Sequence, residues 1–390
     1  MVAGALARES SLSGWSGLFP AVSVLGAMLL IAVGPQTWIN RVVLGSPAMV
    51  GIGLISYPLY LWHWPLLSFA DVLALAAPDL VVRGGAVLLA VLLAWLTYRF
   101  IEIPVRFGDW RHRSVPTLAT ALATIMALAV STWQLNGLPG RFPTAQVELA
   151  NYQHDTWAAI RSGTCLSYSG YDRFDECIDS PADKDVPLVL LWGDSHAAHL
   201  YPGLQQYESR RIAEFTTAAC APIPGVGKLG CVKNNDWVIA CAAALQPSRV
   251  ILAADWGTPD WHRLDDTLGA LRRIGVEDIV IVGPAPKWRF PLPKALVLYA
   301  TRYGAPFPER MSFALVPGRD ALDAAMRSFA RSRGVAYASP YQALCNDAGC
   351  RTFDEVVPDR LIAFDESHLT VFGSNYVVRR ILAGATASPR

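Results

Sequence analysis

The chain has 390 residues, and its 33 Lys and Arg nearly balance 32 Asp and Glu, for a net charge of +1. This balance gives no reason to expect a nucleic acid partner, because nucleic-acid-binding domains usually carry a basic stripe. Hydrophobic residues make up 53 % and charged residues only 17 %, against roughly 25 % charged in ordinary soluble domains. The composition excludes a disordered chain and argues against a wholly soluble enzyme.

Long apolar stretches dominate the N-terminal third of the sequence. They cover residues 18–34, 49–70, 84–101 and 116–133. Each approaches the roughly 20 residues that a helix needs to cross a bilayer. A buried soluble helix is the alternative for any one of them, but it does not suit four in succession. We therefore predict about four transmembrane helices in residues 1–136, with the lipid bilayer as their partner.

The arginines between these stretches predict the orientation of the helices. Four of them lie at the end of the third stretch and in the break after it: Arg99, Arg106, Arg111 and Arg113. Because basic loops stay in the cytoplasm, this loop is expected to be cytoplasmic and both chain ends to be outside. A chain that starts outside with no preceding span is awkward to insert. We therefore expect the chain to be the C-terminal part of a longer membrane protein.

All seven cysteines lie beyond the last apolar stretch. Three close pairs are expected as disulfides, although other pairings remain open: Cys165–Cys177, Cys220–Cys231 and Cys345–Cys350. Cys241 is left over. Zinc is the competing interpretation, but no CxxC or clustered Cys/His spacing is present, so no metal site is expected. Short-range pairs are typical of disulfides in an exported domain, which agrees with the orientation derived from the arginines.

The sequence changes character after the last apolar stretch. Residues 137–185 are polar and irregular, and we expect an extracytoplasmic linker there. From residue 186 to 390, short apolar runs alternate with helical stretches. The apolar runs lie at 187–192, 249–254, 278–282, 335–338 and 361–364, and the helical stretches at 232–245, 261–274, 319–333 and 371–383. Alternating strands and helices predict an α/β domain with a parallel sheet covered on both faces. Its reactive site is expected at the carboxyl ends of the strands.

The first expected strand ends in the motif Gly193-Asp194-Ser195. A serine on a tight turn between strand and helix exposes its hydroxyl at the carboxyl edge of the sheet. The N-terminus of the helix behind it supplies backbone N–H donors for an oxyanion. The alternative is an ordinary turn in which Asp194 or Ser195 only caps the helix.

A second motif, Asp365-x-x-His368, follows the last expected strand. A serine nucleophile needs a base for its proton and a carboxylate to hold the imidazole in one tautomer. Taken alone, Asp365 is explained as a helix cap and His368 as a surface residue. Both motifs at the two ends of one alternating domain favour nucleophilic catalysis. His199, one helical turn after Ser195, is a competing base, for which a capping or surface role is the stronger expectation.

The two motifs together resemble the SGNH hydrolase superfamily. In the apolar region, the strings ISYPLYLWHWP at residues 55–65 and YRFIEIP at residues 98–104 resemble the last helices of the membrane acyltransferase-3 family. Bacterial members of that family can end in an extra helix and an exported SGNH domain. The resemblance covers nearly the whole chain. It implies an α-helical membrane segment with a fusion helix in residues 1–136 and a three-layer α/β SGNH domain in residues 186–390.

Members of this fused type O-acetylate cell-surface polysaccharides such as lipopolysaccharide. The resemblance implies Ser195 as nucleophile, His368 as base and Asp365 as its orienting partner. It also implies a surface glycan as acceptor and acetyl-CoA or another acyl donor, with no cofactor held by the protein. The expected location is the bacterial inner membrane, as a multi-pass protein with its C-terminal domain in the periplasm.

Two departures from the family pattern stand out. The membrane family has many more spans, so the membrane acyl-transfer site is either missing or supplied elsewhere, for instance by a separate membrane subunit. The second expected strand ends in Asp255, where an SGNH domain carries an Asn that helps to bind the oxyanion. We therefore expect the oxyanion to rest on the backbone N–H of Ser195 and on a glycine such as Gly225.

Two other functions remain open. An exported carbohydrate esterase would form the same acyl-enzyme and pass the acyl group to water. A truncated remnant would be a membrane-anchored module without transferase activity. Several tryptophans could stack on sugars, and of these Trp256 and Trp288 follow expected strands and are the ones placed to reach the active edge.

Overall fold

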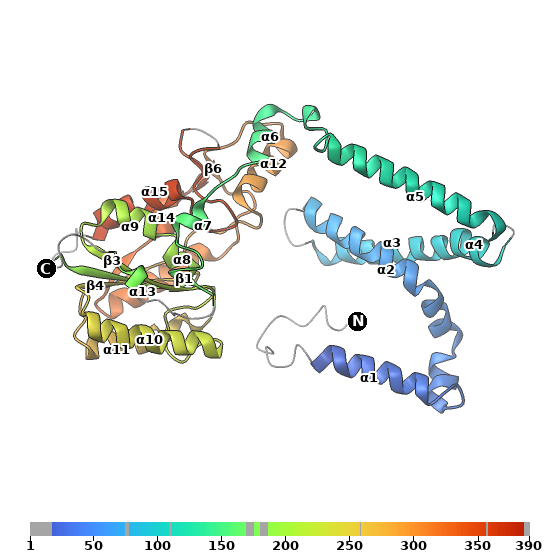
Figure 1. The fold of residues 1–390 in the computed structure, drawn as a ribbon, viewed down its shortest axis with the longest axis horizontal. Helices are drawn as coiled ribbons and strands as arrows, with labels where there is room; N and C mark the ends of the chain where they lie inside the picture. The colour runs from blue at the N-terminus through green and yellow to red at the C-terminus, as the bar shows by residue number, and fades with distance from the viewer. Residues whose placement is uncertain are drawn as a thin grey trace. The chain divides into compact units, whose positions relative to one another are not determined.

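The computed structural model describes residues 18–74, 78–108, 111–168, 175–179, 186–257, 259–355 and 358–385. The chain divides into two compact units, Met1–Gln134 and Leu135–Arg390. The first unit consists of helices, and the second combines helices with strands (Figure 1).

The apolar stretches of the sequence form the helices of the first unit. Its elements are α1 (Leu18–Ala32), the π-helix η2 (Ile39–Leu44), α2 (Pro47–Ala74), α3 (Leu80–Thr97), the π-helix η3 (Tyr98–Glu102), α4 (Ile103–Phe107) and α5 (Arg111–Gln134). The Trp62 indole N–H of α2 donates to the Thr97 hydroxyl of α3 at 3.0 Å. Among the described residues, Leu80–Phe107 and Val115–Gln134 are long and apolar enough to cross a membrane, whereas Pro20–Ala32 is shorter. Four transmembrane helices therefore stay a prediction.

The second unit is built on a parallel sheet, which confirms the fold class expected from the sequence. Its strands run in the order β1–β3–β2–β4–β5–β7, and every neighbouring pair is parallel. The strands are β1 (Leu166–Ser167), β2 (Leu188–Gly193), β3 (Arg211–Thr217), β4 (Arg249–Ala253), β5 (Ile279–Val282) and β7 (Ala336–Ala338). A smaller antiparallel sheet joins β6 (Arg310–Met311), β9 (Gly349–Arg351) and β8 (Cys345–Asn346).

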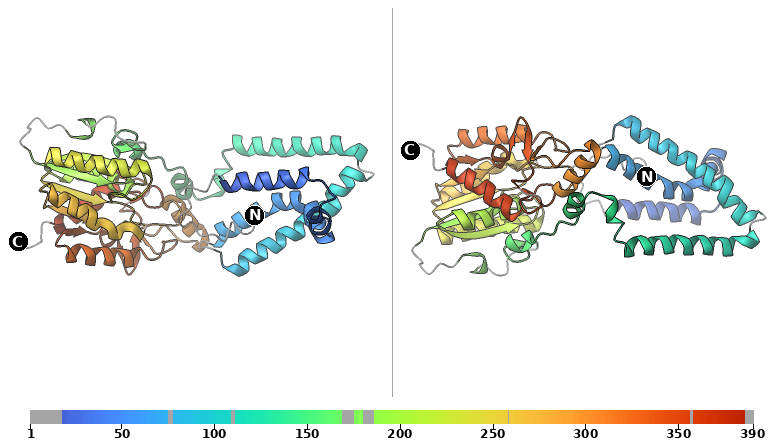
Figure 2. Two further views of the ribbon diagram at one scale, coloured as in Figure 1. Left: turned by 90° about the horizontal axis from the view of Figure 1, so that it is seen from below. Right: turned by 90° about the horizontal axis from the view of Figure 1, so that it is seen from above.

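Helices cover both faces of the parallel sheet, so the unit has three layers. One face carries α10 (Leu229–Leu245), α11 (Leu264–Arg273) and α13 (Arg319–Ser332), and the other carries α9 (Tyr201–Tyr207) and α15 (Val371–Ala385). In Figure 2, the yellow helices α10 and α11 lie in front in the view from below, and the red α15 lies in front in the view from above. The remaining helices are η4 (Pro139–Arg141), α6 (Thr144–Ala150), α7 (Thr156–Ala159), η5 (Asp175–Cys177), α8 (Ser195–Ala198), η6 (Pro259–Arg263), α12 (Leu292–Tyr303) and α14 (Pro340–Leu344).

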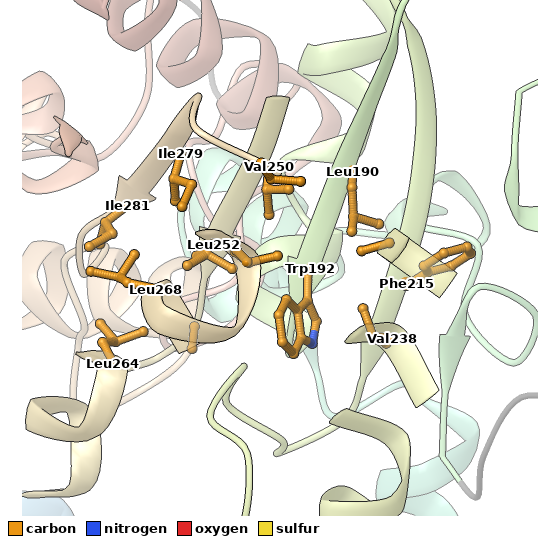
Figure 3. Packing of buried hydrophobic residues seen from close by; sticks show 14 of the residues in the cluster. Leu190, Trp192, Phe215, Val238, Val250, Leu252, Leu264, Leu268, Ile279 and Ile281 are labelled. Atoms are coloured by element: carbon orange, nitrogen blue, oxygen red, sulfur yellow. The ribbon is translucent and has the colours of Figure 1, made fainter. Parts of the chain in front are cut away.

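A large hydrophobic core lies between the sheet and the α10–α11–α13 layer. Leu190 and Trp192 of β2 belong to it together with Val238 of α10 (Figure 3). Successive strand residues point to opposite faces, so β2 must be apolar on both sides, and all six of its residues are buried. The opposite face is lined by Leu204 of α9 and Val378 of α15. The core therefore holds β2, and with it the turn that follows, rigidly in place.

The structure corrects two expectations about strands. Residues 361–364 are not a strand of the sheet, because their only ladder contacts are the isolated antiparallel bridges Phe353–Leu361 and Ala363–Leu369 among the described residues. A further strand, β3, lies between β1 and β2 and was not expected from the sequence. It carries the buried residue Glu214, which is 0 % exposed. A charged residue interrupts the apolar run by which a central strand is recognised, so the sequence did not predict β3.

Three disulfides tie loops of this unit, and they are the pairs expected from the sequence: Cys165–Cys177, Cys220–Cys231 and Cys345–Cys350. Cys241 is free and partly buried, and burial raises the pKa of its thiol to about 11. The first disulfide and β1 come from residues 137–185, expected as a linker. Part of that segment therefore belongs to the α/β unit.

Candidate active site

Ser195 is the first residue of α8 and follows β2 directly. In the sheet, β2 lies between β3 and β4. The chain therefore adds β3 on one side of β2 and β4 on the other side. Ligands bind at the carboxyl ends of strands where the strand order reverses in this way. A Cβ on Gly193 would lie 1.7 Å from the carbonyl oxygen of Ala253, so only glycine lets β2 approach β4 here. This close approach fixes the position of the Ser195 turn.

The structure brings the three predicted catalytic residues together. His368 Nε2 lies 2.8 Å from Ser195 Oγ, and His368 Nδ1 lies 2.6 Å from Asp365 Oδ2. A carboxylate favours the proton on Nδ1, which leaves Nε2 free to accept the Ser195 hydroxyl proton. This is the arrangement in which a histidine activates a serine for attack on an acyl carbonyl.

A tight turn presents both Asp365 and His368 to the serine. Asp365 Oδ1 accepts the backbone N–H groups of Ser367 at 2.8 Å and His368 at 2.7 Å. The Ala363–Leu369 bridge closes the base of the turn. Residues 361–364 therefore form part of this turn and not a strand of the sheet. Burial raises the pKa of Asp365, but the hydrogen bond and charge of the His368 ring, together with the two N–H groups, outweigh it and hold this pKa below its usual value. The carboxylate is therefore ionised and orients the imidazole.

Asp194 has the capping role that the sequence left open. Its Oδ1 accepts the His196 backbone N–H at 2.7 Å, and its Oδ2 accepts the Asp255 backbone N–H at 3.0 Å. Burial raises the pKa of Asp194 to about 6, even though both N–H groups lower it. Because Asp194 caps α8, the hydroxyl of Ser195 is left to interact with His368.

Two further histidines lie buried behind the triad. His199 is 2 % exposed, so the expected surface role is wrong, whereas it does cap α8 as its C-terminal cap residue. Its Nδ1 accepts a hydrogen bond from the Leu369 backbone N–H at 3.4 Å. His196 Nε2 lies 3.3 Å from the Ser367 hydroxyl. Burial lowers the pKa of His199 and lowers that of His196 to about 3, so both rings stay neutral. Each supports the turn that carries His368.

A charged cluster occupies the end of β4, at the position where the resemblance implied an Asn. Asp255 Oδ2 accepts a hydrogen bond from Lys287 Nζ at 2.9 Å, and Asp255 Oδ1 forms an ion pair with Arg319 Nη2 at 2.7 Å. Burial raises the pKa of Asp255, but the charges of Arg319 and Lys287 outweigh it and hold this pKa well below its usual value. No local motif in the sequence indicates this cluster, because its members lie far apart along the chain.

The second oxyanion donor is still a prediction. Gly225 lies in the loop between β3 and α10 with a φ of 69°. A Cβ at this position would have Arg263 Nη2 as its nearest described neighbour, at 3.7 Å.

Trp256 and Trp288 do not present their rings at the active edge. Trp256 is 3 % exposed and donates its indole N–H to the Val282 carbonyl at 2.8 Å. Trp288 is 1 % exposed, and its backbone N–H donates to the Glu366 carbonyl at 2.8 Å. Both therefore support the scaffold and not a sugar. Trp157 of α7, in contrast, is an exposed ring that flanks His368. It lies in the segment expected as a linker, and it is not among the tryptophans expected to stack on sugars.

Comparison with known proteins agrees with this geometry. A Staphylococcus aureus protein (strain MRSA252), provisionally named as an O-acetyltransferase, is 31 % identical over 121 residues, which cover 29 % of this chain and 20 % of that protein. The peptidoglycan O-acetyltransferase OatA of Listeria monocytogenes is 26 % identical over 128 residues, which cover 28 % of this chain and 20 % of that protein. The aligned part therefore spans about a fifth of the length of these relatives.

A solved structure shares the fold of the second unit. The periplasmic domain of a lipopolysaccharide acetyltransferase from Salmonella ser. Paratyphi A superimposes with a TM-score of 0.54 at 24 % identity, over 62 % of this chain and 100 % of that one. Residues 162–383 match the family described as the SGNH domain fused to AT3 domains. Because this match covers more than half of the 390 residues, the chain belongs to that family of SGNH domains.

Proposed function

We propose that the chain acts in O-acyl transfer, with acetyl as the acyl group and a cell-surface polysaccharide as the acceptor. The observation that carries the proposal is the hydrogen-bonded series Ser195–His368–Asp365 at the carboxyl edge of the sheet. The names of the relatives support acetyl transfer.

The first half-reaction forms a serine ester. Ser195 Oγ attacks the acyl carbonyl carbon while His368 Nε2 takes the hydroxyl proton. The bond between the acyl carbon and the donor breaks, and the leaving group takes the proton from His368. The backbone N–H of Ser195, helped by Gly225, would hold the negative charge on the carbonyl oxygen. Acetyl-CoA or another acyl donor supplies the group, and a separate membrane subunit is one route across the bilayer.

The second half-reaction releases the acyl group to the glycan. A sugar hydroxyl gives its proton to His368 Nε2 as its oxygen attacks the ester carbon. The bond to Ser195 Oγ then breaks, and this oxygen recovers the proton. Attack by water in place of the sugar hydroxyl would make the same site a carbohydrate esterase, so the two functions differ only in the acceptor.

The location follows from both units. The exposed apolar helices suit a bilayer, and the basic segment around Arg99 and Arg106 suits its cytoplasmic side. The disulfides suit an oxidising compartment for the second unit. We therefore propose a multi-pass protein of the bacterial inner membrane with the SGNH domain in the periplasm.

A simple ester tests the proposed chemistry. The full chain in detergent should release 4-nitrophenol from 4-nitrophenyl acetate, and Ser195→Ala, His368→Ala and Asp365→Asn should each lower kcat/KM by about 10³-fold or more. The losses should not add, because the three residues act as a unit. His199→Ala is the control, and a larger loss there than in His368→Ala would overturn the assignment. Mass spectrometry of added oligosaccharides then separates transfer from hydrolysis.

A further inference from the structure

An exposed aromatic ring flanks the catalytic histidine. The centroid of the Trp157 ring lies 5.8 Å from that of the His368 ring, and the two planes meet at 54°. Trp157 is 40 % exposed, although it is among the largest apolar side chains of the unit. Leaving this much apolar surface in water is unfavourable, and an exposed aromatic surface beside reacting groups indicates a binding site.

Contacts with other rings hold Trp157 in position. It meets Phe364 edge to face at 5.2 Å, and His154 stacks on Phe364 at 4.1 Å. Phe364 also stacks with His368 at 5.9 Å, so the same ring braces the base and the tryptophan. The neighbouring Thr156 is 2 % exposed, which anchors α7 beneath its exposed tryptophan. Trp157 is therefore a fixed wall beside the base.

We propose that Trp157 is the acceptor-binding residue, which stacks on a pyranose ring of the glycan and places one of its hydroxyls against His368 Nε2. This inference rests on the proposed acyl transfer. The C–H groups on one face of a pyranose carry partial positive charge, and the face of an indole is negative. A rigid aromatic wall also costs little conformational entropy on binding.

The position of Trp157 in the chain points to acceptor choice. The family match covers residues 162–383, and α7 precedes it in the chain. The serine, the base and the carboxylate all come from within that segment. Because Trp157 and the reacting groups come from different segments of the chain, Trp157 would affect which acceptor binds and not the acyl chemistry itself.

The test measures how the acyl group divides between sugar and water. The full chain in detergent receives 4-nitrophenyl acetate with maltopentaose, cellopentaose or an N-acetylglucosamine pentamer. Nitrophenol release reports acyl-enzyme formation, and mass spectrometry counts O-acetylated sugar. We expect Trp157→Ala to lower the ratio of O-acetylated sugar to nitrophenol by about tenfold, through a higher KM for the sugar, and Trp157→Phe to restore most of it.

Tyr207→Ala is the matched control. Tyr207 is also 40 % exposed, but it ends α9 just before β3 begins at Arg211, at the amino edge of the sheet and away from the triad. The ratio of O-acetylated sugar to nitrophenol in Tyr207→Ala should equal that of the wild type. The inference is overturned if Trp157→Ala keeps the wild-type ratio, or if the wild type hydrolyses the ester but acetylates none of the three sugars. Absence of nitrophenol release from the wild type would instead overturn the proposed function.

Discussion

The two units of the chain place similar apolar residues in opposite surroundings. In the helical unit, Ile31 is 80 % exposed and Leu88 is 72 % exposed, whereas Leu190 and Ile281 of the α/β unit are fully buried. Side chains of this kind are stable only away from water. The α/β unit supplies that environment from its own core, and the helical unit needs it from outside. The α/β unit can therefore fix buried polar groups for chemistry with its own core.

A glycine pair should show this difference most strongly. Gly193→Ala places a Cβ against the Ala253 carbonyl, so it should destabilise the α/β unit by about 4 kcal/mol or more, or prevent its folding. Gly85→Ala in α3 meets no atom within 4 Å and should leave stability unchanged or slightly higher, because alanine favours helix by about 1 kcal/mol. Thermal unfolding in detergent measures both. Equal losses of stability in the two variants would contradict the difference in packing between the two units.

Removing the carboxylate that pairs with a buried arginine should lower the free energy of unfolding of the α/β unit nearly as much as Gly193→Ala does. Asp255→Ala leaves Arg319, whose side chain is 8 % exposed, without its carboxylate. Breaking such a pair costs roughly 3–5 kcal/mol, because the remaining charge stays buried. The control is Asp266→Ala, which breaks an ion pair with Arg263 whose side chains are about half exposed, and which should cost less than about 1 kcal/mol. Denaturant titration of both variants should show the difference, and similar losses would contradict the cluster's burial.

Glu214 should make stability depend on pH. Burial raises its pKa to about 8, and the Arg161 charge and the Thr216 hydroxyl only partly oppose this. A carboxyl whose folded-state pKa lies above its unfolded value of 4.5 contributes most below pH 4.5 and loses that contribution as the pH rises to about 8. The slope is at most about 1.4 kcal/mol per pH unit. Glu214→Gln should flatten the curve across this window, and an unchanged curve would contradict the shift.

Local motifs account for what the sequence predicted correctly. Gly193-Asp194-Ser195 and Asp365-x-x-His368 each lie within a few residues, and the turn that holds each is set by the neighbouring backbone. The close cysteine pairs follow the same logic. Alternating apolar runs predicted the parallel sheet, because both faces of such strands must be buried.

What the sequence did not show depends on contacts between distant segments. Lys287 and Arg319 reach Asp255 from 32 and 64 residues away. The burial of His199 depends on the turn at Leu369, which is 170 residues further along the chain. The position of Trp157 beside His368 depends on its contact with Phe364, which comes from a distant part of the chain. Such groups acquire their roles through packing, which no local pattern records.

Labelling of Ser195 tests the central claim most directly. A sulfonyl fluoride reacts with an activated serine and leaves an adduct that does not turn over, so peptide mapping of the full chain can locate it. We predict one adduct per chain, on Ser195, and loss of labelling in His368→Ala and Ser195→Ala. An adduct on a different residue, or unchanged labelling in either variant, would contradict the account of the α/β unit as the site of the chemistry.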